Sequence, residues 1–278
     1  MKKNKKIFSK VLVYIILIGG AIICLIPFFW LVRSSFMKIE QIFLLPPEWI
    51  PRPFTFENYI EAFTLLPFGR YFFNTILIVG SVMAGTLITS SICAYGFSRI
   101  EWKGRNLIFS LILSSMMLPY AATLIPTFIG WSKLGAINTY FPLTVPAWFG
   151  GGAFNIFLLK QFFQGIPHEL DESAVMDGAG HFTIYYKIIL PLVKPALVVV
   201  ALFTFMNTWN DFLAPLIYIN DDSKFTLALG LQLFTSQYTA QWHLLMAAAT
   251  VILLPVVIVF LIGQKYFIEG ITMTGLKG

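Results

Sequence analysis

Polar side chains that could do chemistry gather at two places in this 278-residue chain, which is otherwise 58% hydrophobic. The first is the segment HELDESAVMDGAGHFTIYYKIILP, residues 168–191, in which four carboxylates and two glycines fall within thirteen residues. The second is a cluster of amide, hydroxyl and carboxylate groups beside an indole, formed by Asn207, Thr208, Trp209, Asn210 and Asp211. Amides and carboxylates suit the hydroxyl groups of a sugar, and an indole face suits the apolar side of a pyranose ring.

Neither place has the residues of an enzyme active site. The three histidines do not converge, because His168 and His181 flank a short helix and His243 begins an apolar run. No Ser/His/Asp arrangement is evident, and no G-x-x-x-x-G-K-[ST] phosphate loop occurs. The two cysteines, Cys24 and Cys93, lie in apolar runs and indicate neither a disulfide nor a metal site. We therefore expect no catalytic residue, no metal and no cofactor on this chain.

Long apolar runs must position these groups. A mean hydropathy of +0.79 and a charged fraction of 12% are typical of an integral membrane protein. Each run is long enough to cross about 30 Å of hydrocarbon as a helix, and none shows the period-two alternation of barrel strands. The runs are residues 11–32, 71–97, 107–130, 143–163, 195–219 and 242–263. We predict an all-α, polytopic membrane protein with six transmembrane helices.

Basic residues set the expected orientation in the membrane. Cytoplasmic segments are enriched in Lys and Arg, and the first run is preceded by Lys2, Lys3, Lys5, Lys6 and Lys10. Both termini are therefore expected in the cytoplasm, together with residues 98–106, 164–194 and 264–278. Most of the 19 basic residues then fall inside. The net charge of +6 thus reflects topology and gives no reason to propose nucleic-acid binding.

The remaining features indicate helix packing within one domain. Ser81 and Gly85 form a small-xxx-small pair, which favours close approach of helices, and Gly150–Gly152 fits close packing or a hinge better than phosphate binding. The outer segment 34–70 contains five prolines among aromatic residues, and is expected to be an irregular, partly packed cap of unknown role. No internal repeat is visible, so residues 1–278 are expected to form a single membrane domain.

The segment 168–191 has the local signals of two short helices joined by a glycine turn. Its first acidic residues favour a helix N-terminus, and Gly178 with Gly180 fits a C-terminal stop. Ser173 and Ala174 are small enough for close approach by another surface, and the acids are expected to be solvated. A second helix is expected from about residue 181 to 190, ending at the next proline, with three exposed aromatic side chains, Phe182, Tyr185 and Tyr186. An apolar and aromatic patch on a cytoplasmic loop indicates a protein contact.

The spacing of this segment resembles the EAA loop of bacterial ABC importer permeases, whose pattern is EAA-x3-G-x9-I-x-LP. The matching residues are Glu172, Ala174, Gly178, Ile188, Leu190 and Pro191. The one departure is Ser173, where alanine is usual and serine is nearly isosteric. Three flanking stretches resemble the carbohydrate-importer branch, the maltose-type inner-membrane permeases: AFNIFLLKQFFQGIP at 153–167, TWNDFLAPLIYI at 208–219 and QKYFIEGITMTGLKG at 264–278. The likeness covers nearly the whole chain.

The resemblance implies a permease subunit of the bacterial cytoplasmic membrane that works with several partners. These are a homologous second permease in a heterodimer, a dimer of ATPase subunits that holds ATP and Mg²⁺, and an extracytoplasmic sugar-binding protein. The short helix around Glu172, Asp177 and Gly178 would dock in a cleft of the ATPase, with Glu172 pairing with a basic residue. Closure of the ATPase dimer would swing the helices between inward-facing and outward-facing states. The same resemblance places three tail residues against the ATPase, namely Glu269, Gly270 and Gly275.

Two interpretations of the second polar cluster stay open. Asp211 caps helices or bonds to a sister subunit near the outer boundary, or it contacts the sugar together with Asn207, Trp209 and Asn210. The rival class is a carrier driven by protons or sodium, but Asp211 is the one plausible intramembrane carboxylate. An ABC permease for a non-sugar solute would share the coupling loop. The expected function is ATP-driven import of a di- or oligosaccharide, with residues 164–194 as the cytoplasmic coupling loop.

Overall fold

The computed structural model describes the backbone of residues 2–235 and 240–275 and the side chains of residues 10–235 and 240–266. The regular elements in these ranges are helical, and their β pairing is one isolated bridge between Thr235 and Ala240. This confirms the all-α expectation. The chain divides into two compact units, Met1–Phe68 with Gly230–Leu254 and Gly69–Leu229 with Pro255–Gly278, which are described separately. The expectation of one permease domain over the whole chain stays a prediction.

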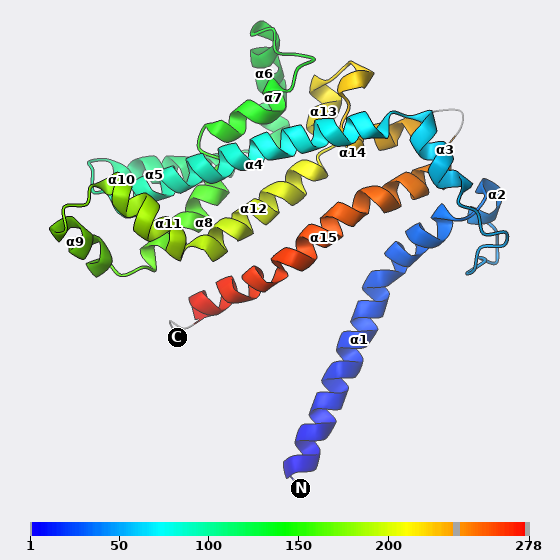
Figure 1. Ribbon diagram of the computed structural model, residues 1–278, viewed down its shortest axis with the longest axis horizontal. Helices are drawn as coiled ribbons and strands as arrows, with labels where there is room; N and C mark the ends of the chain where they lie inside the picture. The colour runs from blue at the N-terminus through cyan, green and yellow to red at the C-terminus, as the bar shows by residue number, and fades with distance from the viewer. Residues whose placement is uncertain (1, 236–239, 276–278) are drawn as a thin grey trace. The chain divides into compact units, whose positions relative to one another are not determined.

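Within the described residues, four helical segments, one of them interrupted, are long and apolar enough to cross a membrane by themselves. They are Lys10–Ser35 of α1 (Lys2–Ser35), α4 (Phe68–Ser98), Phe141–Gln164, and Trp242–Tyr266 of α15 (Trp242–Gly275). Two helix pairs are sharply bent (Figure 1), α5 (Arg105–Ser115) with α6 (Tyr120–Lys133) by 98°, and His181–Leu192 with α12 (Lys194–Trp209) by 78°. Counting each bent pair as one crossing gives up to six crossings. The number of crossings and the orientation of the termini stay predictions.

Three of the predicted apolar runs are interrupted, so the expectation of one continuous helix is wrong for each of them. The run 107–130 breaks before Pro119, whose ring and missing N–H cannot continue α5. The run 195–219 breaks after α12, and a separate helix, α13 (Leu213–Tyr218), follows. The run 143–163 comprises α7 (Phe141–Thr144), a 3-10 turn (Val145–Trp148) and α8 (Ala153–Gln164). Gly150–Gly152 interrupt this last run because all three glycines have a positive φ.

The unit formed by Met1–Phe68 and Gly230–Leu254 contains the outer segment that was expected to be a packed cap. Its short helices are α2 (Ile39–Ile42) and α3 (Glu57–Leu65), with a 3-10 turn at Gln232–Phe234. The Asn58 amide donates to the carbonyls of Ser35 and Met37 at 2.9 and 2.8 Å, which ties α3 to the end of α1. The ring centroids of Phe36 and Phe54 lie 4.4 Å apart. These contacts confirm a partly packed cap.

The second unit is built around one buried cluster, which includes the predicted coupling segment. The cluster joins α4, α8, α9 (Glu169–Met176), a π-helical turn (Ile184–Ile189) and α12. Its buried side chains are Ala94, Tyr95, Leu159, Phe163, Ala174, Ile184, Tyr185, Ile189, Val193, Ala196 and Val200. Figure 1 shows α9 and α10 (His181–Thr183) at one end of α4. The coupling segment therefore packs into the hydrophobic core of this unit instead of lying free in solvent.

Small residues let other segments approach α4 closely. The Trp148 indole lies against Gly85, where an added Cβ would be 2.8 Å from the ring, and its Nε1 donates to the Ser81 hydroxyl at 3.3 Å. Gly151, with a φ of +64°, lies against the backbone of α4, because an added Cβ would be 2.8 Å from the Thr86 carbonyl oxygen. The small-xxx-small pair and the glycine triplet thus serve close packing, as their sequence patterns indicated.

We expect Gly85→Ala to destabilise the protein by about 1–3 kcal/mol, because the new methyl group would overlap the Trp148 ring. Gly80→Ala is the matched control, since Gly80 lies in the same helix and an added Cβ there would meet no atom within 4 Å. That substitution should stabilise α4 by up to about 1 kcal/mol. Thermal unfolding of both variants in one detergent measures the difference, and equal melting temperatures would contradict this packing.

Candidate functional site

The segment predicted to bind a partner begins with α9 and a glycine turn. Three acidic residues occupy the first turn of α9, where negative charge interacts favourably with the helix dipole. At its other end, the Gly178 N–H donates to the Val175 carbonyl and the Ala179 N–H to the Ala174 carbonyl, both at 2.9 Å. This pair of bonds is a Schellman motif, which needs a left-handed residue, and Gly178 supplies it with a φ of +81°. A Cβ on Gly178 would meet no atom within 4 Å, so the position faces open space.

The chain continues as a second helix with an irregular middle. It runs through α10, the π-helical turn Ile184–Ile189 and α11 (Leu190–Leu192). The helix expected from about residue 181 to 190 is therefore present, but Pro191 lies inside α11 and does not end it. Proline has no N–H, and its ring displaces the carbonyl four residues earlier, so regular α-helical bonding cannot run through Pro191. π turns of this kind are frequent at functional sites.

Arg99, the residue after α4, fixes the start of α9. Its guanidinium donates to the Asp171 carboxylate at 3.0 Å. It also donates to the carbonyls of Phe163, in the last turn of α8, and Ile166, just after α8, at 2.5 and 2.8 Å. The Arg99 side chain is 1% exposed and that of Asp171 18% exposed, so water barely reaches the ion pair. The expectation that the acids of this segment are all solvated is therefore wrong for Asp171. In the sequence, Arg99 is only one of several basic residues expected in the cytoplasm, because nothing near it in the chain identifies its partner.

Two tyrosines fix the following turn to α4. Tyr185 is buried, and its hydroxyl lies 2.8 Å from the Ser91 hydroxyl on α4. The Tyr95 ring, also on α4, has its centroid 5.3 Å from that of Tyr185, and its hydroxyl lies 3.5 Å from Nδ1 of His181. The expectation that Tyr185 is exposed is wrong, because the ring turns inward onto α4. Ser91, Tyr95 and Arg99 thus make one brace that holds both helices of the segment.

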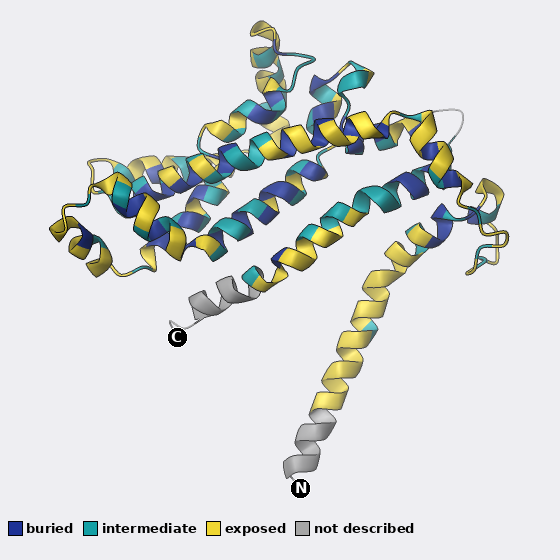
Figure 2. Ribbon diagram, viewed as in Figure 1, coloured by how far each residue is buried: buried dark blue, intermediate teal, exposed yellow. Residues whose placement is uncertain are grey.

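The rest of the segment presents an apolar surface around the glycine turn. Met176 is 87% exposed, Phe182 76% and Tyr186 63%, and Figure 2 shows α9 as mainly exposed. Ala174 is buried in the core cluster, so its small size serves packing within this chain. Of the other predicted coupling residues, Glu172, Ser173, Asp177, Gly178 and Pro191 are exposed, and Ile188 and Leu190 are partly buried. The predicted tail contacts Glu269, Gly270 and Gly275 lie outside the residues whose side chains are described.

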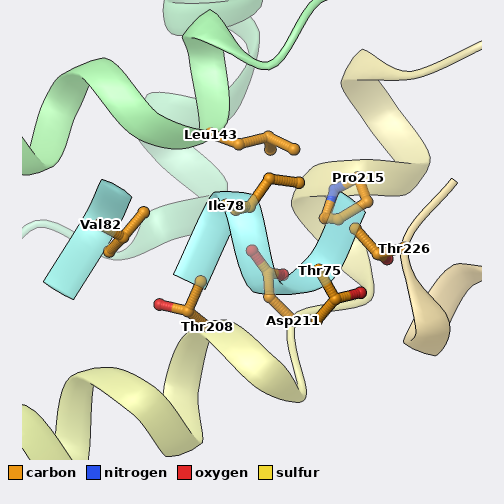
Figure 3. Close-up of a pocket in the computed structure, with 8 residues that line it drawn as sticks. All are labelled: Thr75, Ile78, Val82, Leu143, Thr208, Asp211, Pro215 and Thr226. Carbon is orange, nitrogen blue, oxygen red and sulfur yellow. The ribbon is translucent and has the colours of Figure 1, made fainter. Parts of the chain in front are cut away.

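The second polar cluster borders a small cavity in the same unit (Figure 3). The cavity has a volume of about 70 Å³ and is lined by Thr75, Ile78, Val82, Leu143, Thr208, Asp211, Pro215 and Thr226. Pockets that hold small-molecule ligands measure about 300–1,000 Å³, whereas one water occupies about 30 Å³. In this conformation the cavity therefore has room for a few waters and not for a sugar.

The Trp209 indole is not available to stack on a sugar in this conformation. Its side chain is 2% exposed and packs between two other rings, with centroids 5.3 Å from Phe205 and 6.1 Å from Phe72. The expectation that its indole offers a face to a solute is wrong for this conformation, because the chain's own aromatic residues cover it. Asn207 and Asn210 are exposed, and the Asn210 amide donates to the carbonyl of Met206 at 2.7 Å.

Asp211 makes the capping interaction that its sequence position left open as one of two interpretations. Its Oδ1 accepts a hydrogen bond from the Ala214 N–H, at the start of α13, at 3.2 Å.

We expect Asp211→Asn to keep both stability and uptake near native, because the amide oxygen can still accept this bond. Asp211→Ala should lose about 1 kcal/mol of stability. Thermal unfolding and uptake kinetics measure both, and an altered solute affinity in Asp211→Asn at unchanged melting temperature would assign a solute contact instead.

Asn138 also has a structural role that its sequence position does not reveal. It adopts a φ of +62°, and its Oδ1 accepts hydrogen bonds from the N–H groups of Asn220 and Asp221 at 3.2 and 3.1 Å. The Lys224 ammonium donates to the Asn138 carbonyl at 2.8 Å. Hydrogen bonds from Ser223 lower the pKa of the Asp221 carboxyl. The chain after α6 is therefore bonded to the chain after α13, and the only local signal is an asparagine, which tolerates left-handed backbone.

The fold and the site define a polytopic α-helical membrane subunit whose braced segment exposes its tip to a partner. Residues 86–272 match the family described as "Binding-protein-dependent transport system inner membrane component". The chain belongs to this family.

Relatives with similarity over the full length agree with this assignment. The chain is 35% identical over 278 residues to the trehalose/maltose transport system permease protein MalG of Thermococcus litoralis, covering 99% of each. It is 32% identical over 280 residues to the arabinooligosaccharides transport system permease protein AraQ of Halalkalibacterium halodurans, covering 99% of this chain and 100% of the relative. A chain in the crystal structure of a bacterial ABC transporter involved in alginate import has the same fold, with a TM-score of 0.83 at 24% identity, covering 95% of this chain and 98% of that one.

Family membership confirms three of the sequence expectations. The chain is an inner-membrane protein and a permease subunit of an ABC importer. It is a transport component and not an enzyme, because the ATPase of such a system is a separate chain. The family description also confirms, at a coarse level, that the chain works in a system with a substrate-binding protein.

Proposed function

We propose that this permease imports a carbohydrate, a di- or oligosaccharide. The two relatives described above are named for trehalose and maltose and for arabinooligosaccharides. The stretches at 153–167, 208–219 and 264–278, which resemble carbohydrate permeases, support the same class of solute. An ion-coupled secondary carrier is not favoured, because the family depends on a binding protein.

The observation that carries the coupling proposal is the braced segment with an exposed tip. An ATPase docks on the surface around Gly178, where Met176 and Phe182 expose apolar area and Glu172 and Asp177 expose charge. The Schellman turn has a glycine at position 178, and no atom lies within 4 Å of where its Cβ would be. A partner surface can therefore approach the backbone closely there. Glu172 pairs with a basic residue of that ATPase.

Movement of the docked segment passes to α4 through the brace. Ser91, Tyr95 and Arg99 contact the segment, and Thr75 and Val82, on the same helix, line the small cavity. At 1.5 Å per residue, the sixteen residues from Thr75 to Ser91 span about 24 Å of one uninterrupted helix. A rigid helix held at one end converts displacement of its partner into displacement at the other end. The cavity enlarges in the solute-conducting state.

The complete importer contains this chain in a heterodimer with a homologous permease, a dimer of ATPase subunits and an extracytoplasmic sugar-binding protein. ATP and Mg²⁺ bind the ATPase, and this chain holds no cofactor. The tail residues Glu269, Gly270 and Gly275 contact the ATPase dimer. In the pathway, Asn207 and Asn210 offer amide groups to sugar hydroxyls, since both are exposed at the C-terminal end of α12.

The test isolates the complex from its native membrane and asks what the segment touches. A photoreactive amino acid is placed at Met176, which is 87% exposed, or at Lys103, which is also exposed on the expected cytoplasmic side. We expect an ATPase crosslink from position 176 and none from position 103, with a second permease among the copurified chains. A chain that purifies alone and transports in liposomes without ATP would overturn the coupling proposal. A complex whose binding protein holds a non-sugar solute would overturn only the choice of carbohydrate.

A further inference from the structure

Residues 43–50 of the outer cap, named here the interface loop, carry a dense set of exposed apolar side chains. Leu45 is 89% exposed, Ile50 66% and Phe43 62%, and Trp49 and Leu44 are also exposed. The water-exposed surface of a protein rarely has so many large apolar side chains within eight residues unless another molecule covers them.

The interface loop folds back along the outer end of α1. The Trp49 ring lies with its centroid 6.4 Å from both the Phe29 and Trp30 rings, stacked on the first and edge-on to the second. One residue earlier, the Glu48 carbonyl accepts a hydrogen bond from Nε of Arg33 at 2.5 Å. The loop is therefore held beside the last two turns of a helix that is itself apolar enough to span the membrane.

The length of α1 sets the depth of this contact. Its apolar part, Lys10–Ser35, has 26 residues and measures about 39 Å as a helix. About 20 residues cross the hydrocarbon, so counting from Lys10 the outer boundary falls near Trp30. Trp and Tyr are enriched at this level of membrane proteins. Trp49 contacts Trp30, so it lies at the same level, and Ile50 is the next residue of the loop.

A buried cation, Arg33, lies near this boundary and is held within the cap by the loop and the Trp30 ring. The Arg33 side chain is buried, its guanidinium carbon lies 4.2 Å from the centroid of the Trp30 ring, and it donates to the Glu48 carbonyl. A cation over an indole face is stabilised when it is shielded from water. The loop can therefore approach lipid without exposing this cation to it, since the Arg33 side chain is buried beneath the loop and the Trp30 ring.

We propose that the interface loop is a membrane anchor that embeds in the outer interface of the bilayer. The surface continues the exposed apolar surface of α1, whose most apolar 18-residue window has no buried residue. The occupant is the boundary between lipid headgroups and acyl chains, where Trp and aliphatic side chains both bind favourably. The anchor fixes the outer cap at a set height above the membrane and leaves its polar surface to the aqueous side.

Collision accessibility of nitroxide labels in lipid nanodiscs tests this proposal. Single cysteines replace Leu45 or Ile50 in a chain whose Cys24 and Cys93 are changed to serine, within the assembled importer. Two reference positions complete the set, Ile16 in the middle of α1 and Glu40 in the cap, both exposed. Oxygen, which concentrates in lipid, and a water-soluble nickel chelate are the two probes. Retained uptake and an unchanged elution volume show that each labelled chain is folded.

We expect the oxygen-to-nickel ratio at positions 45 and 50 to lie severalfold above that at position 40 and below that at position 16. Ratios equal to that at position 40 would show an aqueous surface and overturn the proposal. Low collision rates with both probes would show that a protein covers the loop, and this too would overturn it. Trp49→Ala should shift the ratio at position 45 toward the aqueous reference, whereas Trp49→Phe, which keeps an aromatic contact with α1, should not.

Discussion

Gly178→Asp is expected to abolish uptake while the chain still inserts into the membrane. Any L-residue at a φ of +81° strains the turn, by about 1–2 kcal/mol for most side chains. The open space around Gly178 would also be filled by a side chain at the place where the ATPase is proposed to dock. Because 1.4 kcal/mol is about tenfold in an equilibrium, a loss of uptake of at least about tenfold is expected. Solute uptake per copy of membrane-inserted chain measures it.

Two uncharged variants separate the effect of strain from the effect of size. Asn tolerates left-handed backbone better than Ala but is larger. If the bare backbone is needed for docking, Gly178→Ala should retain more uptake and more copurified ATPase than Gly178→Asn. If only the turn geometry matters, the order reverses. Native uptake in Gly178→Asp would show that the turn is not the coupling element.

Arg99→Ala is expected to destabilise the braced segment by roughly 3 kcal/mol, the lower end of the range for removing one partner of a buried ion pair. The substitution leaves Asp171 without its cation and removes two hydrogen bonds, one to a carbonyl in the last turn of α8 and one to a carbonyl just after it. The melting temperature should fall, protease cleavage near the glycine turn should increase, and uptake should be lost.

Arg99→Lys is the matched control for charge. Lysine keeps the positive charge but has no planar fork to reach the carboxylate and both carbonyls together, so an intermediate loss is expected. Asp171→Asn should cost less than Arg99→Ala, because the neutral amide still accepts a hydrogen bond. The double variant Arg99→Ala with Asp171→Ala should lose less than the sum of the two single losses. Strict additivity would contradict the brace, as would native stability in Arg99→Ala.

The sequence predicted well those properties that depend on neighbours along the chain. The positions of the apolar runs follow from local hydropathy and match α1, α4 and α15 closely. The glycine turn after α9 follows from a single residue type that tolerates left-handed backbone. Sharp breaks inside three runs were missed, because a proline or a glycine in a membrane helix can either kink it or end it.

The candidate site was predicted less completely than the fold, because its contacts join distant parts of the chain. Asp171 and Arg99 are 72 residues apart, and the hydroxyls of Ser91 and Tyr185 are 94 residues apart. Tyr185 and its neighbour Tyr186 are the same residue type, yet one is buried and the other 63% exposed. No local pattern separates them, since the difference lies in which face meets α4.

By itself, then, the amino-acid sequence determined the membrane class, the helical architecture and the family pattern. These follow from the lengths of the apolar runs and the spacing of the motif residues, which depend only on the order of residues in the chain. The tertiary structure alone decided that Ala174 packs inward, that Trp209 is covered by other rings, and that Asp211 caps α13. The physical reason is that a membrane helix is apolar both where it faces lipid and where it faces its neighbours. Hydrophobicity therefore does not mark the buried face, and only the packed structure shows which side chains meet.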